Sequence, residues 1–447
     1  MTGKVMDSVR ELELSYTFNY SQDLLFRFKQ WLDGNFSVTD QYVEVLDENN
    51  ARTRIHGGAI KSVVHKKLID SSRFVVAIYN NFVPLVKREC VEIEYNQCNE
   101  TVKRLCKTRV YQNKQLYGDV EIKFELLYYE TNTGDYLDPL SVTKVIALYN
   151  HINTDNVIDI TSNSHVGSDE ILANCRLEYE YNDDLSQHTI LNVANLINTI
   201  ERTLVDYAIA PFLSHTAIFN ELSYRPFVDE KLLSDNAMDI AWWALKLDGV
   251  RGKGYIVNGA YVYIELDDMQ LFSGPITAPA EFLTNKVVGV QMEFVQSTFF
   301  ITDILGLYKY KYDNRNQYDI APLINIDVSA AVCFMNQNKD TSVQFGEYQI
   351  KFQRFYRDRS SINTEWAPND GYIGLNKDYE IVKIKPQKSY EMKYQGDNVF
   401  VCSFGVYNID QRPPSLTLVV GSVYEVIIKC DNIVTVVKER PDRLISN

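Results

Sequence analysis

Histidine and cysteine are scarce in this chain of 447 residues, which contains six histidines and seven cysteines. There is no His-Glu-x-x-His spacing and no Cys-x-x-Cys pair, so the sequence gives little support for a zinc site. The cysteines are scattered and odd in number. This pattern favours reduced, mostly buried thiols of an intracellular protein over a disulfide framework.

Long apolar runs and an excess of positive charge are also missing. No run has the roughly 20 residues of a membrane-spanning helix, and the polar, charged N-terminus predicts neither a signal peptide nor secretion. The net charge of −14 excludes a general nucleic-acid coat, although a local basic channel stays possible. With 45% hydrophobic residues, the chain is long enough for two or three domains with ample cores.

What the first 205 residues do contain is a series of predicted β-strands that carry charge along one face. Glu11 and Glu13 alternate with leucines, and a second acidic pair, Glu178 and Glu180, alternates with apolar and tyrosine residues. Side chains two residues apart in a strand share a face. In an ordinary half-buried sheet such charges face water. Because the acidic pairs recur far apart, the alternative is a closed barrel with a charged interior.

A charged barrel interior would suit a metal ion and a polyphosphate. Two Glu-x-Glu strands side by side offer the oxygen ligands that Mg²⁺ or Mn²⁺ prefers, and basic strands opposite would bind phosphate. Glu92 and Glu94 form a competing acidic pair. Strand alternation alone supplies the basic candidates, which are Arg52, Arg54, Lys107, Arg109 and Lys123.

A second chemical feature is a lysine just before a glycine-rich turn. Lys246 stands between two leucines and opens a Lys-x-Asp-Gly-x-Arg pattern that ends at Arg251. Partial burial and nearby cations can lower the pKa of a lysine until its free amine acts as a nucleophile. Arg251 would then reach a phosphate or a ribose. The plain alternative is a surface turn with a solvated lysine.

The order of these features resembles that of a known enzyme family. Glu-x-Glu pairs at 11–13 and 178–180, upstream of a Lys-x-Asp-Gly motif, are similar to the two metal-binding motifs of the tunnel-type, metal-dependent RNA triphosphatases. The resemblance implies that Glu11, Glu13, Glu178 and Glu180 bind the metal and act in catalysis. Glu92 and Glu94 fit the family order less well. Helical apolar spacing over 189–200 predicts a helix packed on the barrel, leading to a boundary near 205–225.

After Lys246 the chain resembles the covalent nucleotidyltransferases, motif by motif. The matching segments are Val288–Glu293, Phe299–Leu305, Asp370–Ile373 and Val382–Pro386. The family chemistry is attack by the lysine amine on the α-phosphate of a nucleoside triphosphate, which expels pyrophosphate.

The same resemblance implies roles for single residues in the nucleotide pocket. Glu293 would bind the ribose, an aromatic ring would stack on the base, and Lys383 with Lys385 would contact the phosphate. Asp370 belongs to the fourth motif and is also expected at the nucleotide. The stacking ring is open between Phe299 and Phe300, because Thr302 stands where the family often has an aromatic residue. Phe300 is the chosen candidate. Taken singly, each of these residues is ordinary in a strand, core or turn.

The last 60 residues predict a small separate fold. Five short strands are expected near 389–395, 398–409, 415–420, 422–430 and 432–438. This density of strands is typical of an OB-fold. The C-terminal residues Arg440, Asp442 and Arg443 resemble the sixth motif of mRNA guanylyltransferases, which closes over the triphosphate. Arg443 stands where lysine is usual, which preserves the charge but not the geometry.

The predicted fold class is α+β, with three domains. An antiparallel β-tunnel of the triphosphatase type is expected over residues 1–205, a nucleotidyltransferase domain over 225–386 and an OB-fold over 387–447. The arrangement resembles the baculovirus capping enzymes, which are subunits of a viral RNA polymerase.

That resemblance implies a bifunctional mRNA capping enzyme with a metal cofactor, Mg²⁺ or Mn²⁺. The tunnel would hydrolyse the γ-phosphate of 5′-triphosphate RNA, with nucleoside triphosphate hydrolysis as a side activity. Lys246 would then transfer GMP from GTP to the RNA. Other polymerase subunits would be partners, no membrane would be involved, and the location would be the host nucleus. Two alternatives remain: an ATP-dependent polynucleotide ligase and a non-catalytic polymerase assembly subunit.

Overall fold

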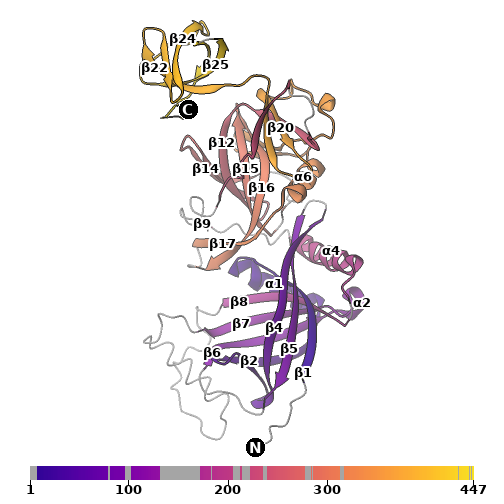
Figure 1. Ribbon diagram of the computed structural model, residues 1–447. Coiled ribbons are helices and arrows are strands. Elements are labelled where there is room, and N and C mark those ends of the chain that lie inside the picture. Colours follow the sequence, from indigo (N-terminus) through magenta and orange to yellow (C-terminus); the bar gives the residue numbers. More distant parts are fainter. Residues whose placement is uncertain are drawn as a thin grey trace, which may run out of the picture.

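The structure is a computed structural model, and it is dominated by strands rather than by an even mixture of helices and strands. Figure 1 shows an eight-stranded barrel near the N-terminus, a two-sheet region in the middle and a small barrel near the C-terminus. The described residues are 8–78, 81–95, 102–130, 172–182, 184–204, 212–213, 222–234, 239–276, 283, 285–312, 317–430, 432–441, 443 and 445–446.

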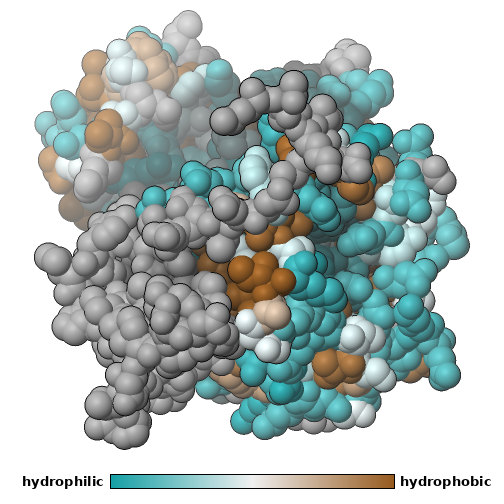
Figure 2. Space-filling view, turned by 90° about the horizontal axis from the view of Figure 1, so that it is seen from below, coloured by the Kyte–Doolittle hydropathy of each residue, from teal (hydrophilic) through white to brown (hydrophobic). Residues whose placement is uncertain are grey.

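The first part is a closed antiparallel barrel with the strand order β1-β5-β4-β3-β2-β6-β7-β8. Many of its charged side chains point inward and line a cavity, while apolar side chains of the same strands point outward and pack against α1 and α4. Seen from below in Figure 2, the described surface is largely hydrophilic, with small hydrophobic groups. The elements are β1 (Ser8–Thr17), α1 (Gln22–Asn35), β2 (Ser37–Asp47), β3 (Ala51–His56), β4 (Ala59–Ile78), β5 (Asn81–Glu94), β6 (Val102–Gln112), α2 (Lys114–Tyr117), β7 (Glu121–Glu130), β8 (Leu172–Tyr181) and α4 (Gln187–Thr203).

Helix α4 confirms the helix predicted over 189–200. Its first turn is capped by Ser186, whose hydroxyl accepts a hydrogen bond from the Thr189 amide at 3.1 Å. Val193, Ile197 and Ile200 recur at helical spacing and are buried against the barrel.

The middle part consists of two sheets. One has the order β10-β21-β20-β11, and the other has β14-β13-β12-β15-β16-β17-β9, with β18 and β19 attached through β16. The elements are β9 (Phe212–Leu213), β10 (Asp229–Leu232), β11 (Trp242–Leu247), β12 (Val250–Val257), β13 (Tyr261–Leu266), β14 (Leu271–Pro275), β15 (Val287–Val295), β16 (Thr298–Tyr312), β17 (Gln317–Asn325), α6 (Val328–Gln337), β18 (Ser342–Phe345), β19 (Tyr348–Phe352), η2 (Arg359–Ser361), β20 (Asn369–Leu375) and β21 (Ile381–Lys385).

The last part is a closed five-stranded barrel, in the order β22-β23-β24-β26-β25. Its strands are β22 (Tyr390–Gly396), β23 (Val399–Cys402), β24 (Gly405–Gln411), β25 (Val423–Cys430) and β26 (Ile433–Glu439). Five strands were expected, but two of the predicted positions were wrong. The strand expected over 398–409 is a hairpin that turns at residues 403–404.

The strand expected over 415–420 does not exist. A turn closes there instead, where the Leu416 amide donates a hydrogen bond to the Pro413 carbonyl at 3.0 Å. Pro413 and Pro414 lack the amide hydrogens that a sheet ladder needs. Leu416 and Leu418 pack against the core of the small barrel without joining its sheet.

The eight-stranded barrel and the two-sheet region share a buried junction. The long β4–β5 hairpin extends from the barrel toward α6 (Figure 1), and the fully buried Phe82 stacks on Phe334 with ring centroids 4.8 Å apart. From the two-sheet region, the Lys286 ammonium donates a hydrogen bond to the Tyr16 hydroxyl of β1 at 2.7 Å and forms an ion pair with Glu201 of α4. Glu201 is 0% exposed and also accepts a hydrogen bond from Asn81 at 3.0 Å. The two parts are thus joined by a polar network as well as by apolar packing.

We expect Lys286→Met to destabilise the chain by about 3–5 kcal/mol, because it leaves the Glu201 carboxylate buried without its counterion. The free energy of the unfolding transition that involves the junction should be measured by denaturant titration. The double variant Lys286→Met with Glu201→Gln should recover part of this loss. Lys377→Met, which removes an exposed lysine, is the control. A loss as small as that of the control would contradict the role assigned to the ion pair.

Candidate active sites

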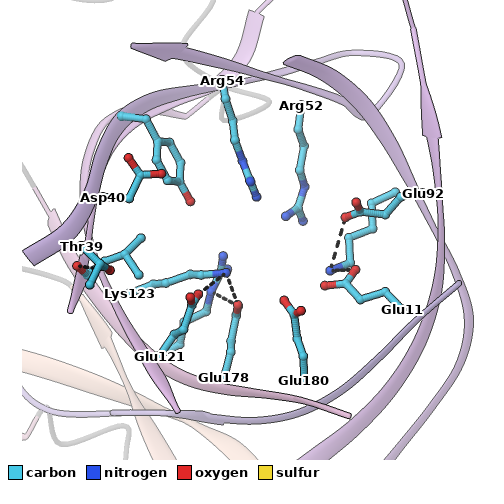
Figure 3. A pocket seen from close by; sticks show the side chains of 14 residues that line it. Glu11, Thr39, Asp40, Arg52, Arg54, Glu92, Glu121, Lys123, Glu178 and Glu180 are labelled. Carbon is cyan, nitrogen blue, oxygen red and sulfur yellow. Dashed lines mark hydrogen bonds and ion pairs between the residues drawn. The ribbon is translucent and has the colours of Figure 1, made fainter. Parts of the chain in front are cut away.

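The interior of the eight-stranded barrel holds a cavity of about 290 Å³ whose lining is almost entirely polar. Figure 3 shows Arg52 and Arg54 pointing into it from one wall, across from Glu178 and Glu180. The lining residues are Glu11, Thr39, Asp40, Tyr42, Arg52, Arg54, Lys66, Glu92, Val110, Glu121, Lys123, Arg176, Glu178 and Glu180.

The two predicted acidic pairs lie on neighbouring strands. Strands β1 and β8 pair so that Glu13 is opposite Glu180 and Ser15 is opposite Glu178. Glu13 is 3% exposed and contacts Arg88 at 3.3 Å. The structure therefore brings Glu11, Glu178 and Glu180 into the lining of the cavity, while Glu13, on the same face of β1 as Glu11, is buried against Arg88 and Lys66 and is not among the lining residues.

Glu178 is the most firmly held of these carboxylates. Arg176 contacts it at 2.5 Å, and Lys123 donates a hydrogen bond to its other oxygen. Burial by itself would raise the pKa of Glu178, but the charges of Arg176 and Lys123 lower it to about 2. Glu125 extends the network, with Arg104 at 3.0 Å and Arg176 at 3.1 Å. Glu178 is thus ionised throughout the physiological pH range.

Three of the five basic candidates face the cavity. Arg52, Arg54 and Lys123 line it, and the Arg54 guanidinium lies 5.0 Å from the centre of the Tyr42 ring. Arg109 faces outward, where it donates a hydrogen bond to Gln41 at 2.9 Å and lies 3.5 Å from Asp33 of α1. Lys107, two residues earlier on β6, has the same outward alternation and is not among the lining residues.

The sequence motifs did not predict several residues in and around the cavity. Arg176 shares a face with Glu178 by simple alternation, so that signal was present. Glu92, whose pair with Glu94 fits the family order less well, also lines the cavity together with Glu11. Lys66, which lines the cavity, and Arg88, which contacts Glu13, carried no motif; the pairing of β4 with β5 and of β5 with β1 places them.

The cavity has the chemistry of a site for a hard divalent cation, since carboxylate oxygens dominate one wall. Within the described ranges, no three acidic, histidine or cysteine side chains converge as a ready ligand set. The carboxylates are instead held by cationic side chains, Glu11 by Lys66 at 2.5 Å and Glu178 by Arg176 and Lys123. The donor types fit Mg²⁺ or Mn²⁺.

A second charged site lies in the two-sheet region, around Lys246 of β11. Its ammonium donates hydrogen bonds to both oxygens of Asp370, each at 2.7 Å. Strands β11 and β20 are neighbours, so residues far apart in the sequence meet here. The turn predicted at Asp248 and Gly249 connects β11 to β12.

Glu293 lies on β15, next to this turn, and its carboxylate accepts a hydrogen bond from the Gly249 amide at 3.2 Å. Burial raises the pKa of Glu293 to about 7, although Lys246, the Gly249 amide and Arg251 oppose the shift. A carboxylate with this pKa accepts hydrogen bonds more fully above neutral pH than below it.

The raised pKa of Glu293 predicts a stability change with pH. Its folded-state pKa exceeds the unfolded value near 4.5, so the folded state loses stability as the pH rises from about 5 to 8. Glu293→Gln cannot ionise, and its melting temperature relative to the wild type should therefore increase over this window. The exposed Glu365→Gln should show no such trend in the same thermal melts. Parallel profiles for Glu293→Gln and the wild type would contradict the shift.

The two candidate stacking rings face opposite ways. Phe300 is the partner of Glu293 across the paired strands β15 and β16, so their side chains share a face of the sheet. The rings of Phe300 and Trp366 pack together with their centroids 5.0 Å apart. Phe299 is fully buried in the core and stacks on Phe294 at 4.5 Å. Phe300 therefore lies on the side of Glu293, and Phe299 does not.

The remaining basic candidates surround this site. Arg251 lies 2.8 Å from Asp267 and 4.0 Å from the centre of the Tyr224 ring. Lys383 lies on β21, and its pKa is lowered by burial, with added repulsion from Lys246. Three cations therefore crowd a small region, which suits an anionic ligand.

The small barrel also reaches this site through ion pairs. Lys438 of β26 contacts Asp248 at 2.5 Å, and Lys385 contacts Glu425 of β25 at 3.5 Å. Arg440 and Arg443 both contact Glu391, at 2.9 and 3.2 Å. These arginines are thus held within the small barrel. Asp442 lies outside the described residues.

The chain therefore has two separate charged sites, one inside a closed barrel and one around a lysine–aspartate pair. It belongs to the Late expression factor 4 (LEF-4) family, whose sequence profile matches residues 11–447. It is similar to the mRNA capping enzyme LEF-4 of Autographa californica nuclear polyhedrosis virus, at 32% identity over 99% of both chains. The mRNA capping enzyme LEF-4 of Orgyia pseudotsugata multicapsid polyhedrosis virus is also 32% identical, over 98% of both chains. The expected relation to the baculovirus capping enzymes is confirmed.

Proposed function

We propose that this chain is a bifunctional mRNA capping enzyme. The observation that carries the proposal is the hydrogen-bonded pair of Lys246 and Asp370, with Glu293 nearby, in the same chain as an acid-lined closed barrel. The names of the two viral relatives support it. We infer three domains: a triphosphate tunnel over 1–205, a nucleotidyltransferase domain over 225–386 and an OB-fold over 387–447.

In the barrel, the proposed reaction is hydrolysis of the γ-phosphate at the 5′ end of RNA. Arg52, Arg54 and Lys123 would bind the triphosphate, because they are the predicted cations that line the cavity. Glu11, Glu13, Glu178 and Glu180 would hold the divalent metal, which when bound supplies charge neutralisation at the γ-phosphate. Hydrolysis of free nucleoside triphosphates is the expected side activity.

In the two-sheet region, the proposed reaction is transfer of GMP. The Lys246 ammonium gives up a proton to solvent, its free amine forms a bond to the α-phosphorus of GTP, and the bond to pyrophosphate breaks. The diphosphate end of the RNA then attacks the same phosphorus, and the bond to Lys246 breaks. Asp370 orients the amine, Glu293 accepts hydrogen bonds from the ribose and Phe300 offers a ring to the base.

Basic side chains would stabilise the charge that develops on the phosphates. Lys383 and Lys385 lie on β21 beside the site, and Arg251 lies on β12. Arg440 and Arg443, with Asp442, would close over the triphosphate from the small barrel. That step requires the arginines to leave Glu391, to which they are paired here.

The test of both steps is a reconstituted reaction. The purified chain is incubated with Mg²⁺ or Mn²⁺ and with RNA labelled at its γ-phosphate, and phosphate release is measured. In parallel, α-labelled GTP and α-labelled ATP are compared for label that survives denaturing electrophoresis. Phosphate release together with GTP-specific label supports the proposal. ATP-specific label would favour a polynucleotide ligase. The absence of both activities would favour the non-catalytic polymerase assembly subunit.

No helix in the described part of the chain is long and apolar enough to cross a membrane. We propose that the partners are 5′-triphosphate RNA, GTP and the other subunits of a viral RNA polymerase. The host nucleus is the proposed location.

A further inference from the structure

Lys66 lies at the centre of the acidic wall of the barrel cavity. It is on β4, directly opposite Glu92 of β5, and its side chain is only 15% exposed. Its ammonium lies 2.5 Å from Glu11, 3.4 Å from Glu13 and 3.9 Å from Glu92. One lysine therefore draws together three carboxylates that come from two different strands.

The carboxylates around Lys66 carry more negative charge than their neighbours neutralise. Glu11, Glu13 and Glu92 share the ammonium of Lys66, and Glu13 also contacts Arg88 at 3.3 Å. Glu178 differs, because Arg176 and Lys123 both contact it. Among the described ion pairs, Glu11 is held by Lys66 alone, so a divalent cation would add positive charge at this carboxylate.

Lysine suits an exchangeable position better than arginine does. Its ammonium is a point charge on a flexible four-carbon stem, and it makes no fork-shaped contact that must be broken in two places. Arg176, by contrast, contacts two carboxylates at once, those of Glu125 and Glu178. Of the two proposed metal ligands on β1, Glu11 is thus paired with a side chain that can move away, whereas Glu13 also contacts Arg88.

We propose that Lys66 is an internal cation that occupies the place of a divalent metal ion and must leave Glu11 before the metal binds. This inference rests on the proposed metal-dependent hydrolysis in the barrel. Lys66 then weakens metal binding, because its departure costs an ion pair and leaves a like charge in the same cavity. Lys66 is a positioning residue in this role, because it sets the metal concentration at which the site becomes occupied.

The test is Mn²⁺ binding to the full chain, without RNA or nucleotide, measured by titration calorimetry. Replacing Lys66 with methionine removes the charge and keeps the length of the side chain. We expect the dissociation constant of Mn²⁺ to fall by at least about tenfold, because that is the size of the repulsion between a divalent and a monovalent cation several ångströms apart even at the dielectric constant of water. Lys66→Arg keeps the charge and should bind Mn²⁺ no more tightly than the wild type.

Lys67→Met is the matched control. Lys67 is the next residue of β4 and is exposed, so the variant loses the same unit of charge without touching the cavity. Its Mn²⁺ affinity should equal that of the wild type. Damage to the fold would weaken binding, so the expected gain in affinity cannot come from misfolding, and thermal melts identify a variant that does not fold. Lys66→Gln then replaces Lys66→Met.

Unchanged or weaker Mn²⁺ binding by folded Lys66→Met, with hydrolysis intact in the wild type, overturns this inference alone. A gain by Lys67→Met equal to that by Lys66→Met also overturns it, because net charge would explain both. If neither the wild type nor Lys66→Met binds Mn²⁺, both the inference and the proposed metal dependence fail. Binding by Lys66→Met but not by the wild type supports the inference.

Discussion

Lys246→Ala is expected to lose covalent labelling by α-labelled GTP by at least about a thousandfold, since no other group replaces a missing nucleophile. Asp370 contacts the Lys246 ammonium through both oxygens at 2.7 Å. The alanine variant removes the nitrogen that would bond to phosphorus and leaves the rest of the pocket in place. Labelled protein should be quantified after denaturing electrophoresis, at saturating GTP.

Two controls separate chemistry from charge. Lys246→Arg keeps the positive charge but not the amine, so it should be as inactive as Lys246→Ala. Lys253→Ala removes a lysine of the neighbouring β12 that lies 3.7 Å from Glu265, and it should keep its label. Release of γ-phosphate from RNA should be normal in all three variants, because that reaction is assigned to the barrel. Full labelling of Lys246→Ala would refute the assigned nucleophile.

Glu178→Ala is expected to reduce γ-phosphate release from RNA by about a hundredfold or more, the range seen when a charged group that positions a reaction is removed. Glu178 is the carboxylate that Arg176 and Lys123 both contact. Its loss would leave two cations without their partner inside a small cavity and would remove a proposed metal ligand. The measurement is initial rate against metal concentration with γ-labelled RNA.

The matched control for this variant is Glu89→Ala. Glu89 lies on β5 of the same barrel but faces outward, where it contacts Arg10 at 2.8 Å. It should hydrolyse RNA at the wild-type rate. Glu178→Ala should still be labelled by GTP as well as the wild type is. A barrel variant that lost both reactions would indicate damage to the whole chain, and one that lost neither would contradict the proposed site.

Alternation along strands predicted much of the barrel interior, but it could not choose the inward face of every strand. In β1 and β8 the carboxylates all fall on one face, so Glu11 and Glu178 could be placed from the sequence. In β6 both faces mix charged with uncharged residues, and the face with Arg109 turned out to contact α1. Only the pairing with neighbouring strands decides such a case.

Contacts between distant segments were beyond the reach of any single-strand pattern. Lys66 meets Glu11 because β4 and β1 both flank β5, and the ion pair of Lys286 with Glu201 joins two parts of the chain. The choice between Phe299 and Phe300 likewise needed the register of β15 with β16. The strand wrongly expected over 415–420 shows the converse, since apolar residues can pack on a core without joining a sheet.

The two junctions of this chain should respond differently to salt. Glu201 and Lys286 are buried between the eight-stranded barrel and the two-sheet region, where dissolved ions do not reach. Lys438 and Asp248, which connect the small barrel to the same region, are about 40% exposed. At 1 M salt the screening length falls to about 3 Å, which weakens only the exposed pair. High ionic strength would therefore weaken the Lys438–Asp248 contact of the C-terminal barrel, while the largely buried pairs Lys385–Glu425 and Lys286–Glu201 persist.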